Sequence, residues 1–313
     1  MLIKSIKPGL SDYNSVKRTW LLMAIIFSVI CLVSTALHYT GAAPGNPFTW
    51  LAWIISVVFI FSYAIEFKGF KKDLSFIKSK RLWFYITLTV LFFVSHLWNY
   101  HNLPWNDKGL FDDGAWDIYF SKKYIFSGQP FQAAFFDQVG YISREVVFHY
   151  FITFFFKLFG YNLLIFNIAL TVLGYITFIF TTLLAERLFK NKYVTIVTAI
   201  VFNFLPLRFM HTYAGHRYAI AAPMIMASFY FTYTGFHMKS KVRLVLGALF
   251  AAFAVDSSVM GKQYLYGIIF GSIIVAIIYW KEIMKKEMLK RVLLYTTFLI
   301  ICMMPLIMYV AFN

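Results

Sequence analysis

The sequence is poor in charge and rich in apolar side chains. Of its 313 residues only 13% are Asp, Glu, Lys or Arg, whereas 61% are hydrophobic. A chain of this composition cannot hide its apolar side chains in one soluble core, and many of its apolar runs approach the length that crosses a bilayer. The composition therefore excludes a soluble globular protein and predicts a polytopic membrane protein.

Cysteines and several familiar motifs are scarce or absent. The two cysteines, Cys31 and Cys302, lie in apolar runs and support neither a disulfide framework nor a thiolate metal site. The sequence has no Asn-x-Ser/Thr sequon, no phosphate-binding loop, and no GxGxxG, HExxH or CxxC motif. The missing sequon weighs against a glycosylated lumenal protein.

Acidic residues are outnumbered by basic ones, which gives a net charge of +16. The basic residues stand in short clusters between apolar runs, as expected for cytoplasmic loops of a membrane protein. We therefore expect membrane lipids, and no nucleic acid, among the partners of this chain.

The apolar runs predict an all-α fold, a polytopic transmembrane bundle of about nine helices. Residues 1–81 are expected to contribute two appended N-terminal helices with basic cytoplasmic segments. Residues 82–313 are expected to form a second transmembrane module, and its final apolar run leaves open a continuation of the protein beyond residue 313. The expected spans are residues 19–39, 48–67, 82–100, 163–186, 193–209, 218–236, 244–256, 264–280 and 292–312.

Residues 101–162 are neither a span nor a short connector, and the basic bias predicts that they form an outer loop. Within this loop, residues 146–159 read VVFHYFITFFFKLF. A helix of this length reaches about 21 Å, short of the roughly 30 Å hydrocarbon core. If it did cross, most of the later basic clusters would move outside, so we expect it to lie in the outer interface or to dip in and return.

The acids of the outer loop are the best candidates for chemistry: Asp107, Asp112, Asp113 and Asp117. The adjacent pair Asp112-Asp113 is flanked by aromatic residues near an apolar surface, a setting that suits a general base. Three cations are expected on the same side and could bind a phosphate: Arg208, Arg217 and Lys262. The histidine spacing matches no metal motif, so the pattern requires no cofactor and leaves a divalent metal open.

Location narrows the reaction, because nucleotide sugars and ATP are absent outside the cytoplasm. An outward-facing transferase needs a donor that arrives in the bilayer already activated, and a polyprenyl-phosphate sugar meets this need. Its phosphate leaving group requires cations more than a proton donor.

The order of these features resembles the GT-C-fold membrane glycosyltransferases, in particular the polyprenyl-phosphate-sugar-dependent protein O-mannosyltransferase and aminoarabinose transferase group. The similar stretches are FDDGAWDIYFSKKYIFSGQPF at 111–131, REVVFHYFITFFFKLFGYN at 144–162, the following span at 163–189, and GALFAAFAVDSSVMGKQYLYG at 247–267. The first two look like the acidic motif and the two juxtamembrane helices of that family.

The resemblance implies an inverting glycosyltransferase of the bacterial cytoplasmic membrane, with its active site on the outer face. Asp112 would deprotonate the acceptor, Asp113 would support it or bind a metal, and Lys262 would meet the donor phosphate. The acceptor, whether glycan, lipid or protein, stays open. The alternatives are a transporter or flippase of a polar or lipid-linked substrate, and a non-catalytic subunit of an envelope complex.

Overall fold

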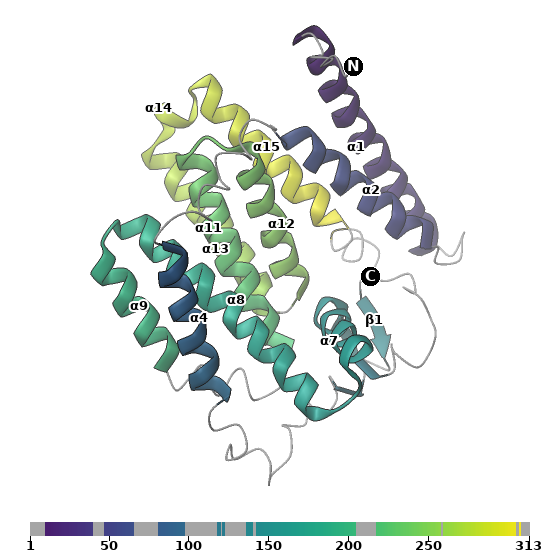
Figure 1. Cartoon of the computed structure of the whole chain (residues 1–313). Helices are drawn as coiled ribbons and strands as arrows, with labels where there is room; N and C mark the ends of the chain where they lie inside the picture. The colour runs from purple at the N-terminus through teal and green to yellow at the C-terminus, as the bar shows by residue number, and fades with distance from the viewer. Residues whose placement is uncertain are drawn as a thin grey trace, which may run out of the picture.

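The computed structural model describes residues 10–39, 47–65, 81–97, 118–119, 121–122, 136–139, 142–204, 217–257, 259–304 and 307. Over these residues the chain is a bundle of helices, which confirms the predicted helical fold (Figure 1). The helices are α1 (Leu10–Tyr39), α2 (Pro47–Ala64), α4 (Arg81–Leu97), α7 (Val146–Phe159), α8 (Leu163–Phe189), α9 (Lys192–Phe204), α11 (Ala221–His237), α12 (Lys241–Ser257), α13 (Val259–Ile278), α14 (Trp280–Ile283) and α15 (Lys286–Cys302), with a 3-10 turn η3 (Arg217–Ile220) before α11.

Membrane association is supported by three helices that are long and apolar enough to cross a bilayer. These candidate spans lie in α1, α8 and α13, as Lys17–Ser34, Leu163–Phe189 and Gly261–Ile278. Four described apolar helices are shorter: Leu51–Ala64, Leu82–His96, Val147–Phe159 and Lys192–Phe204. The full set of nine spans therefore stays a prediction.

One short β-hairpin in the expected outer loop was not predicted. β1 (Phe136–Val139) and β2 (Ile142–Glu145) pair antiparallel, with Val139 opposite Ile142. The sequence signal for it is weak: two residues, Gly140 and Tyr141, separate the strands, and glycine at the first position of a two-residue loop is typical of hairpins. The hairpin leads directly into α7.

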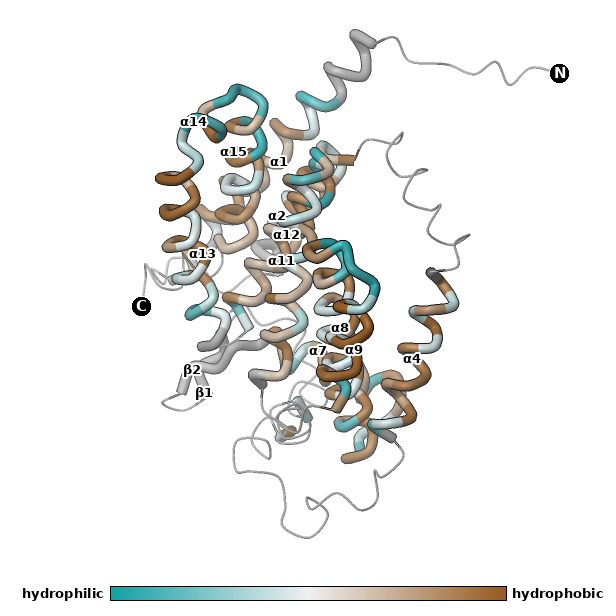
Figure 2. The backbone as a smooth tube through the Cα atoms, turned by 90° about the vertical axis from the view of Figure 1, so that its left-hand side faces the viewer, coloured by the Kyte–Doolittle hydropathy of each residue, from teal (hydrophilic) through white to brown (hydrophobic). Residues whose placement is uncertain are grey.

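The bundle has two ends, which are named from their places in Figure 1. At the lower end α4, α9 and α12 finish and α8, η3 and α13 begin (Figure 1). At the upper end lie the α8–α9 turn, the α11–α12 turn and α14. Figure 2 shows hydrophilic residues at the upper ends of several helices and brown, apolar residues along their lengths. The bundle thus has the layout of antiparallel apolar helices joined by polar turns.

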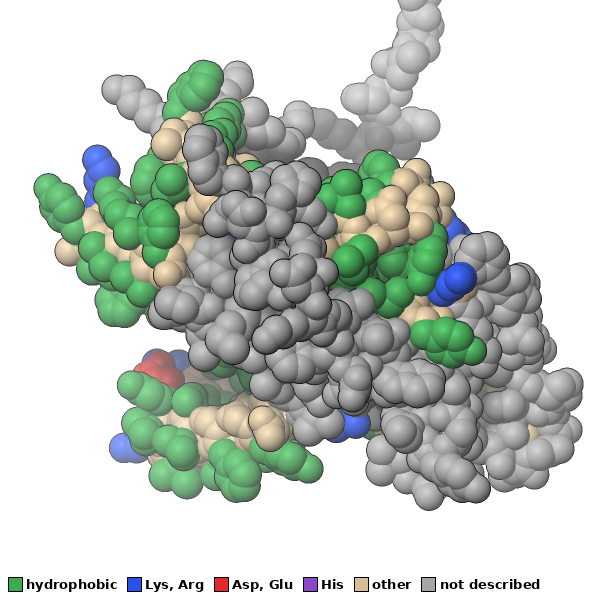
Figure 3. All heavy atoms as spheres, turned by 90° about the horizontal axis from the view of Figure 1, so that it is seen from below, with side chains coloured by type: hydrophobic (Ala, Val, Ile, Leu, Met, Phe, Trp, Pro, Cys, Tyr) green, Lys and Arg blue, Asp and Glu red, His purple; other side chains and the backbone are tan. Residues whose placement is uncertain are grey.

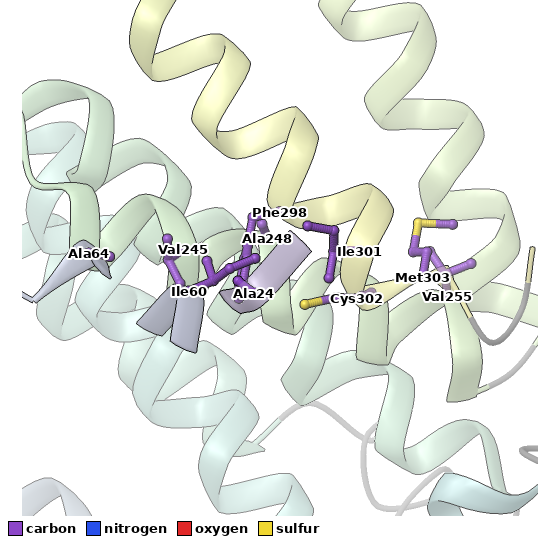
Figure 4. Packing of buried hydrophobic residues seen from close by; sticks show 11 residues of the cluster. Ala24, Ile60, Ala64, Val245, Ala248, Val255, Phe298, Ile301, Cys302 and Met303 are labelled. Carbon is purple, nitrogen blue, oxygen red and sulfur yellow. The ribbon is translucent and has the colours of Figure 1, made fainter. Parts of the chain in front are cut away.

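The largest hydrophobic cluster joins the two ends of the sequence. It contains Ala24 of α1, Ile60 of α2, Ala248 of α12 and Phe298 of α15, each at most 2% exposed (Figure 4). The first two helices also contact each other through Ser28 and Ser56, whose hydroxyl oxygens lie 2.6 Å apart. α1 and α2 therefore share a core with the later helices.

α11 and α12 pack closely, because glycines line their contact. A Cβ on Gly247 would lie 2.8 Å from the backbone nitrogen of Thr232, and a Cβ on Gly235 would lie 2.8 Å from that of Leu244. The hydroxyl of Ser228 donates a hydrogen bond of 2.8 Å to the carbonyl of Gly247. Small residues and a buried hydroxyl of this kind are typical of helix packing in membranes.

α7 begins and ends at the residues that the sequence predicts. One face, with Phe148, Ile152 and Phe156, is buried against α8, while Phe154 and Phe159 on the other face are 57% and 60% exposed. Figure 1 shows α7 beside the lower ends of α8 and α12, with its axis turned away from theirs. An apolar face that no described residue covers, on a helix too short to span, is the pattern of an interfacial helix.

Candidate functional site

The structure describes only part of the predicted site. Asp112, Asp113 and Arg208 lie outside the described residues. Arg217 is described by its backbone, as the first residue of η3. Lys262 lies in the first turn of α13 and is half-buried.

The start of α13 approaches α12 so closely that a side chain would not fit at Gly261. A Cβ at this position would collide with the carbonyl oxygen of Ala254 in α12. The other two glycines of α13 are Gly267 and Gly271. A Cβ added to either would have nothing within 4 Å. Since Lys262 follows Gly261 directly, this contact fixes the position from which the lysine side chain extends from α13.

Asp256, at the end of α12, is the functional candidate that sequence reasoning did not single out. Its side chain is only 3% exposed, and its Oδ1 has no hydrogen-bond partner among the described residues. The preceding residue, Val255, packs in one hydrophobic cluster with Cys302 of α15, and Lys262 follows in the first turn of the next helix, α13. An ionisable side chain buried inside a membrane bundle is costly and usually functional.

The buried carboxyl group of Asp256 is expected to cost stability rather than add to it. Asp256→Asn keeps the shape of the side chain and removes its ionisable group, so the thermal midpoint in detergent micelles should stay level or rise. The matched control is Ser257→Ala, which removes a buried hydroxyl that donates to the carbonyl of Ala254 at 2.7 Å, and it should lower the midpoint. A clear fall in the thermal midpoint of Asp256→Asn would show that the carboxyl group stabilises the fold.

The packing of α11 on α12 brings η3 to the same end of the bundle. Gly235 lies against Leu244 and Gly247 against Thr232, so the two helices run antiparallel and the start of α11 meets the end of α12. Contacts between η3 and α12 agree with this register. The backbone of Arg217 and the Asp256–Lys262 junction therefore share the lower end.

A polar contact joins the last turns of α4 and α9 at this end. The hydroxyl of Ser95 donates to Oδ1 of Asn203 at 3.1 Å and lies 3.0 Å from Nδ1 of His96. Asn203 is fully buried. In the sequence, α4 leads into the acidic stretch and α9 leads into the segment that holds Arg208, so both segments leave the bundle from neighbouring helix ends.

The stretch that follows the acidic motif is held on α7. Ile118 packs against the hydrophobic cluster of α7 and α8. Ser121 is fully buried, its carbonyl accepts a 3.1 Å hydrogen bond from the hydroxyl of Thr153, and its own hydroxyl lies 3.3 Å from Nδ1 of His149. Lys122 lies over the ring of Tyr161, with Nζ 5.0 Å from the ring centroid. The described part of the predicted first juxtamembrane helix is therefore helical and packs on the second.

The described residues of this end contribute few charges. Seen from the lower end, the described side chains are mostly hydrophobic, with a small number of Lys and Arg (Figure 3). Within the described part of the chain, no group of three or more His, Cys, Asp or Glu side chains could hold a metal ion. The described part of this end therefore offers a few ionisable groups in apolar surroundings.

Compared with known proteins, the chain matches no protein-family model, no curated protein and no solved structure.

Proposed function

We propose that this chain is a membrane glycosyltransferase that moves a sugar from a polyprenyl-phosphate donor to an acceptor on the outer face of the membrane. The observation that supports the proposal best is the shared lower end of the bundle. There the half-buried Lys262, the buried Asp256 and the η3 turn of Arg217 lie among apolar helices. A lipid-borne anionic donor needs such a site, with cations at the end of an apolar bundle.

The proposed reaction is a single displacement with inversion. Asp112 takes the proton from an acceptor hydroxyl as the acceptor oxygen bonds to the anomeric carbon of the sugar. The bond from that carbon to the phosphate oxygen breaks, and its electron pair leaves with the polyprenyl phosphate. Lys262, Arg217 and Arg208 stabilise the charge on the phosphate, and Asp113 supports Asp112 or binds a divalent metal.

In the proposed topology nine helices span a bacterial cytoplasmic membrane and α7 lies in its outer interface. The basic turns of the upper end, with Lys190, Lys239 and Lys285, then face the cytoplasm, as positive loops do. The exposed aromatic face of α7 contacts lipid near the headgroups. Residues 101–162 become the outer loop that holds the proposed base.

Cysteine labelling tests this topology, because both native cysteines, Cys31 and Cys302, are only 1% exposed. A membrane-impermeant maleimide added to intact cells should label Tyr161→Cys, in the turn after α7. The same reagent should label Asn191→Cys, in the α8–α9 turn, only after the membrane is permeabilised. The reverse pattern would mean that α7 crosses the bilayer, and the outer-loop proposal would then fail.

Reconstitution tests the activity itself. Purified protein in lipid vesicles would be given polyprenyl-phosphate sugars that bear different radiolabelled sugars, together with glycan, lipid and protein fractions of a cell envelope. We expect label to move into one acceptor fraction as polyprenyl phosphate is released. If none of the donors binds or reacts, the glycosyltransferase proposal is wrong.

A transporter or flippase is the second candidate, and the burial of Asp256 favours it. Ionisable groups inside a membrane bundle mark substrate and ion pathways and proton relays. The same vesicles distinguish the two functions: a fluorescent polyprenyl-phosphate lipid that changes leaflet without losing its sugar would favour transport.

A further inference from the structure

A cavity of about 610 Å³ lies at the upper end of the bundle, far from the proposed donor site along the helix axes. Its lining comes from the start of α4, the α8–α9 turn and the end of α11. The described lining residues are Phe84, Glu186, Arg187, Lys190, Asn191, Lys192, Thr195, Tyr233, Thr234, His237 and Met238.

The lining is basic. Arg187, Lys190 and Lys192 stand against a single acid among the described lining residues, Glu186. The carboxylate of Glu186 already accepts a 2.8 Å hydrogen bond from the hydroxyl of Tyr85. The cavity therefore has an excess of positive charge, which attracts an anion.

The backbone conformation of Lys190 allows its charge to be tested without disturbing the fold. Lys190 ends α8 with φ of 49°, in the left-handed region, where glycine or asparagine is the usual choice. Its N–H donates to the carbonyl of Glu186 at 3.1 Å and closes the helix. Glycine suits this backbone conformation better than lysine, so Lys190→Gly should remove the charge without straining the end of α8.

An apolar groove lies on α9, the helix whose first turn contributes Lys192 and Thr195 to the basic cavity. It has a volume of about 500 Å³. Its described lining is Tyr193, Val194, Val197, Thr198, Val201 and Phe202. Val197 and Val201 are 57% and 54% exposed, on one of the shorter apolar helices of the bundle.

A basic cavity at the start of α9 and an apolar groove along the same helix match a molecule with an anionic head and a hydrocarbon tail. We propose that this site binds an anionic phospholipid, with its phosphate among Arg187, Lys190 and Lys192 and one acyl chain along α9. Basic pockets between transmembrane helices bind anionic headgroups through the same combination of charge and burial. This inference does not rest on the proposed glycosyltransferase activity.

Native mass spectrometry of the purified full chain tests the proposal, with phosphatidylglycerol and phosphatidylcholine of identical acyl chains as probes. Phosphatidylglycerol should bind more tightly than phosphatidylcholine. Lys190→Gly removes one charge while suiting the left-handed backbone, so it should keep the fold and weaken phosphatidylglycerol binding about fivefold. Binding of phosphatidylcholine should not change.

Two matched controls distinguish the loss of a charge in the cavity from the loss of a charge elsewhere on the surface. Lys239→Gly removes a lysine whose φ is also positive, at 58°, in the α11–α12 turn but outside the cavity lining. Lys290→Gln removes a lysine whose hydrogen bond, 2.9 Å long, holds the pKa of Glu287 below its usual range. Neither should change lipid binding. Equal binding of the two lipids, or equal losses for Lys190→Gly and Lys239→Gly, would overturn the proposal.

The groove has its own test. Val197→Trp places a large ring in the apolar groove and should weaken long-chain phosphatidylglycerol while leaving the binding of glycerol phosphate unchanged. If long-chain lipid binds Val197→Trp as well as the parent protein, the acyl chain does not lie along α9. If glycerol phosphate alone binds as tightly as the lipid, the site recognises a free phosphate and the lipid assignment is wrong.

Discussion

Asp112→Asn is expected to lower the rate of sugar transfer by about 10²- to 10⁴-fold, the range that a positioned general base contributes. The amide keeps the size and the hydrogen-bonding oxygen of the side chain but cannot take a proton from the acceptor. Initial rates in vesicles with a reactive polyprenyl-phosphate sugar would measure the loss. The protein should still elute as a folded species, because the substitution is isosteric.

Asp107→Asn is the matched control, since it removes an acid from the same stretch and should leave the rate within a few-fold of the parent. Asp113→Asn shows which acid of the pair acts as the base. A larger loss for Asp113→Asn than for Asp112→Asn would transfer the role of base to Asp113. Full activity in both variants would remove the acid pair from the mechanism.

Gly261→Ala is expected to lower the transfer rate by about a hundredfold, although alanine adds only a methyl group. The new Cβ would collide with the carbonyl oxygen of Ala254, and backbone atoms cannot give way as a flexible side chain does. The start of α13 must therefore shift, and Lys262 shifts with it. A displacement of about 1 Å in a phosphate-binding group can cost about a hundredfold in rate.

The control for this variant lies on the same helix. Gly267→Ala adds the same methyl group where nothing lies within 4 Å, so it should change neither the rate nor the thermal midpoint. The KM for the donor should rise in Gly261→Ala, because Lys262 is the proposed ligand of the donor phosphate. If Gly261→Ala stays folded and keeps the parent KM and rate, Lys262 does not bind the donor.

Local signals in the sequence were sufficient to predict both ends of α7 and the start of α8. α7 spans Val146–Phe159 as predicted, since its aromatic run is followed by Gly160 with φ of 91°. α8 begins at Leu163 as predicted, because the side chain of Asn162 accepts a 2.8 Å hydrogen bond from the N–H of Ile165 and caps the helix. These are contacts between residues a few positions apart.

Contacts between distant residues could not be predicted in the same way. The burial of Asp256 depends on how α12, α13 and α15 pack, and no pattern within α12 reports it. The role of Gly261 also depends on Ala254 of the neighbouring helix. The hairpin before α7 was missed because its two strands have only four residues each, too short to stand out in an apolar sequence.

The pair of serines between α1 and α2 has a consequence for how the protein is made. More than half of the chain lies between α2 and α12, so the helices that complete this core leave the ribosome late. Until then the hydroxyls of Ser28 and Ser56 have partners within the pair of helices, because each lies within hydrogen-bond distance of the other, at 2.6 Å, and of the carbonyl of Ala24, at 2.8 and 2.9 Å. The first two helices can therefore wait in the lipid as a hairpin with both serine hydroxyls already bonded, whereas the indole N–H of Trp53 gains its partner, the carbonyl of Ile301, only when α15 arrives.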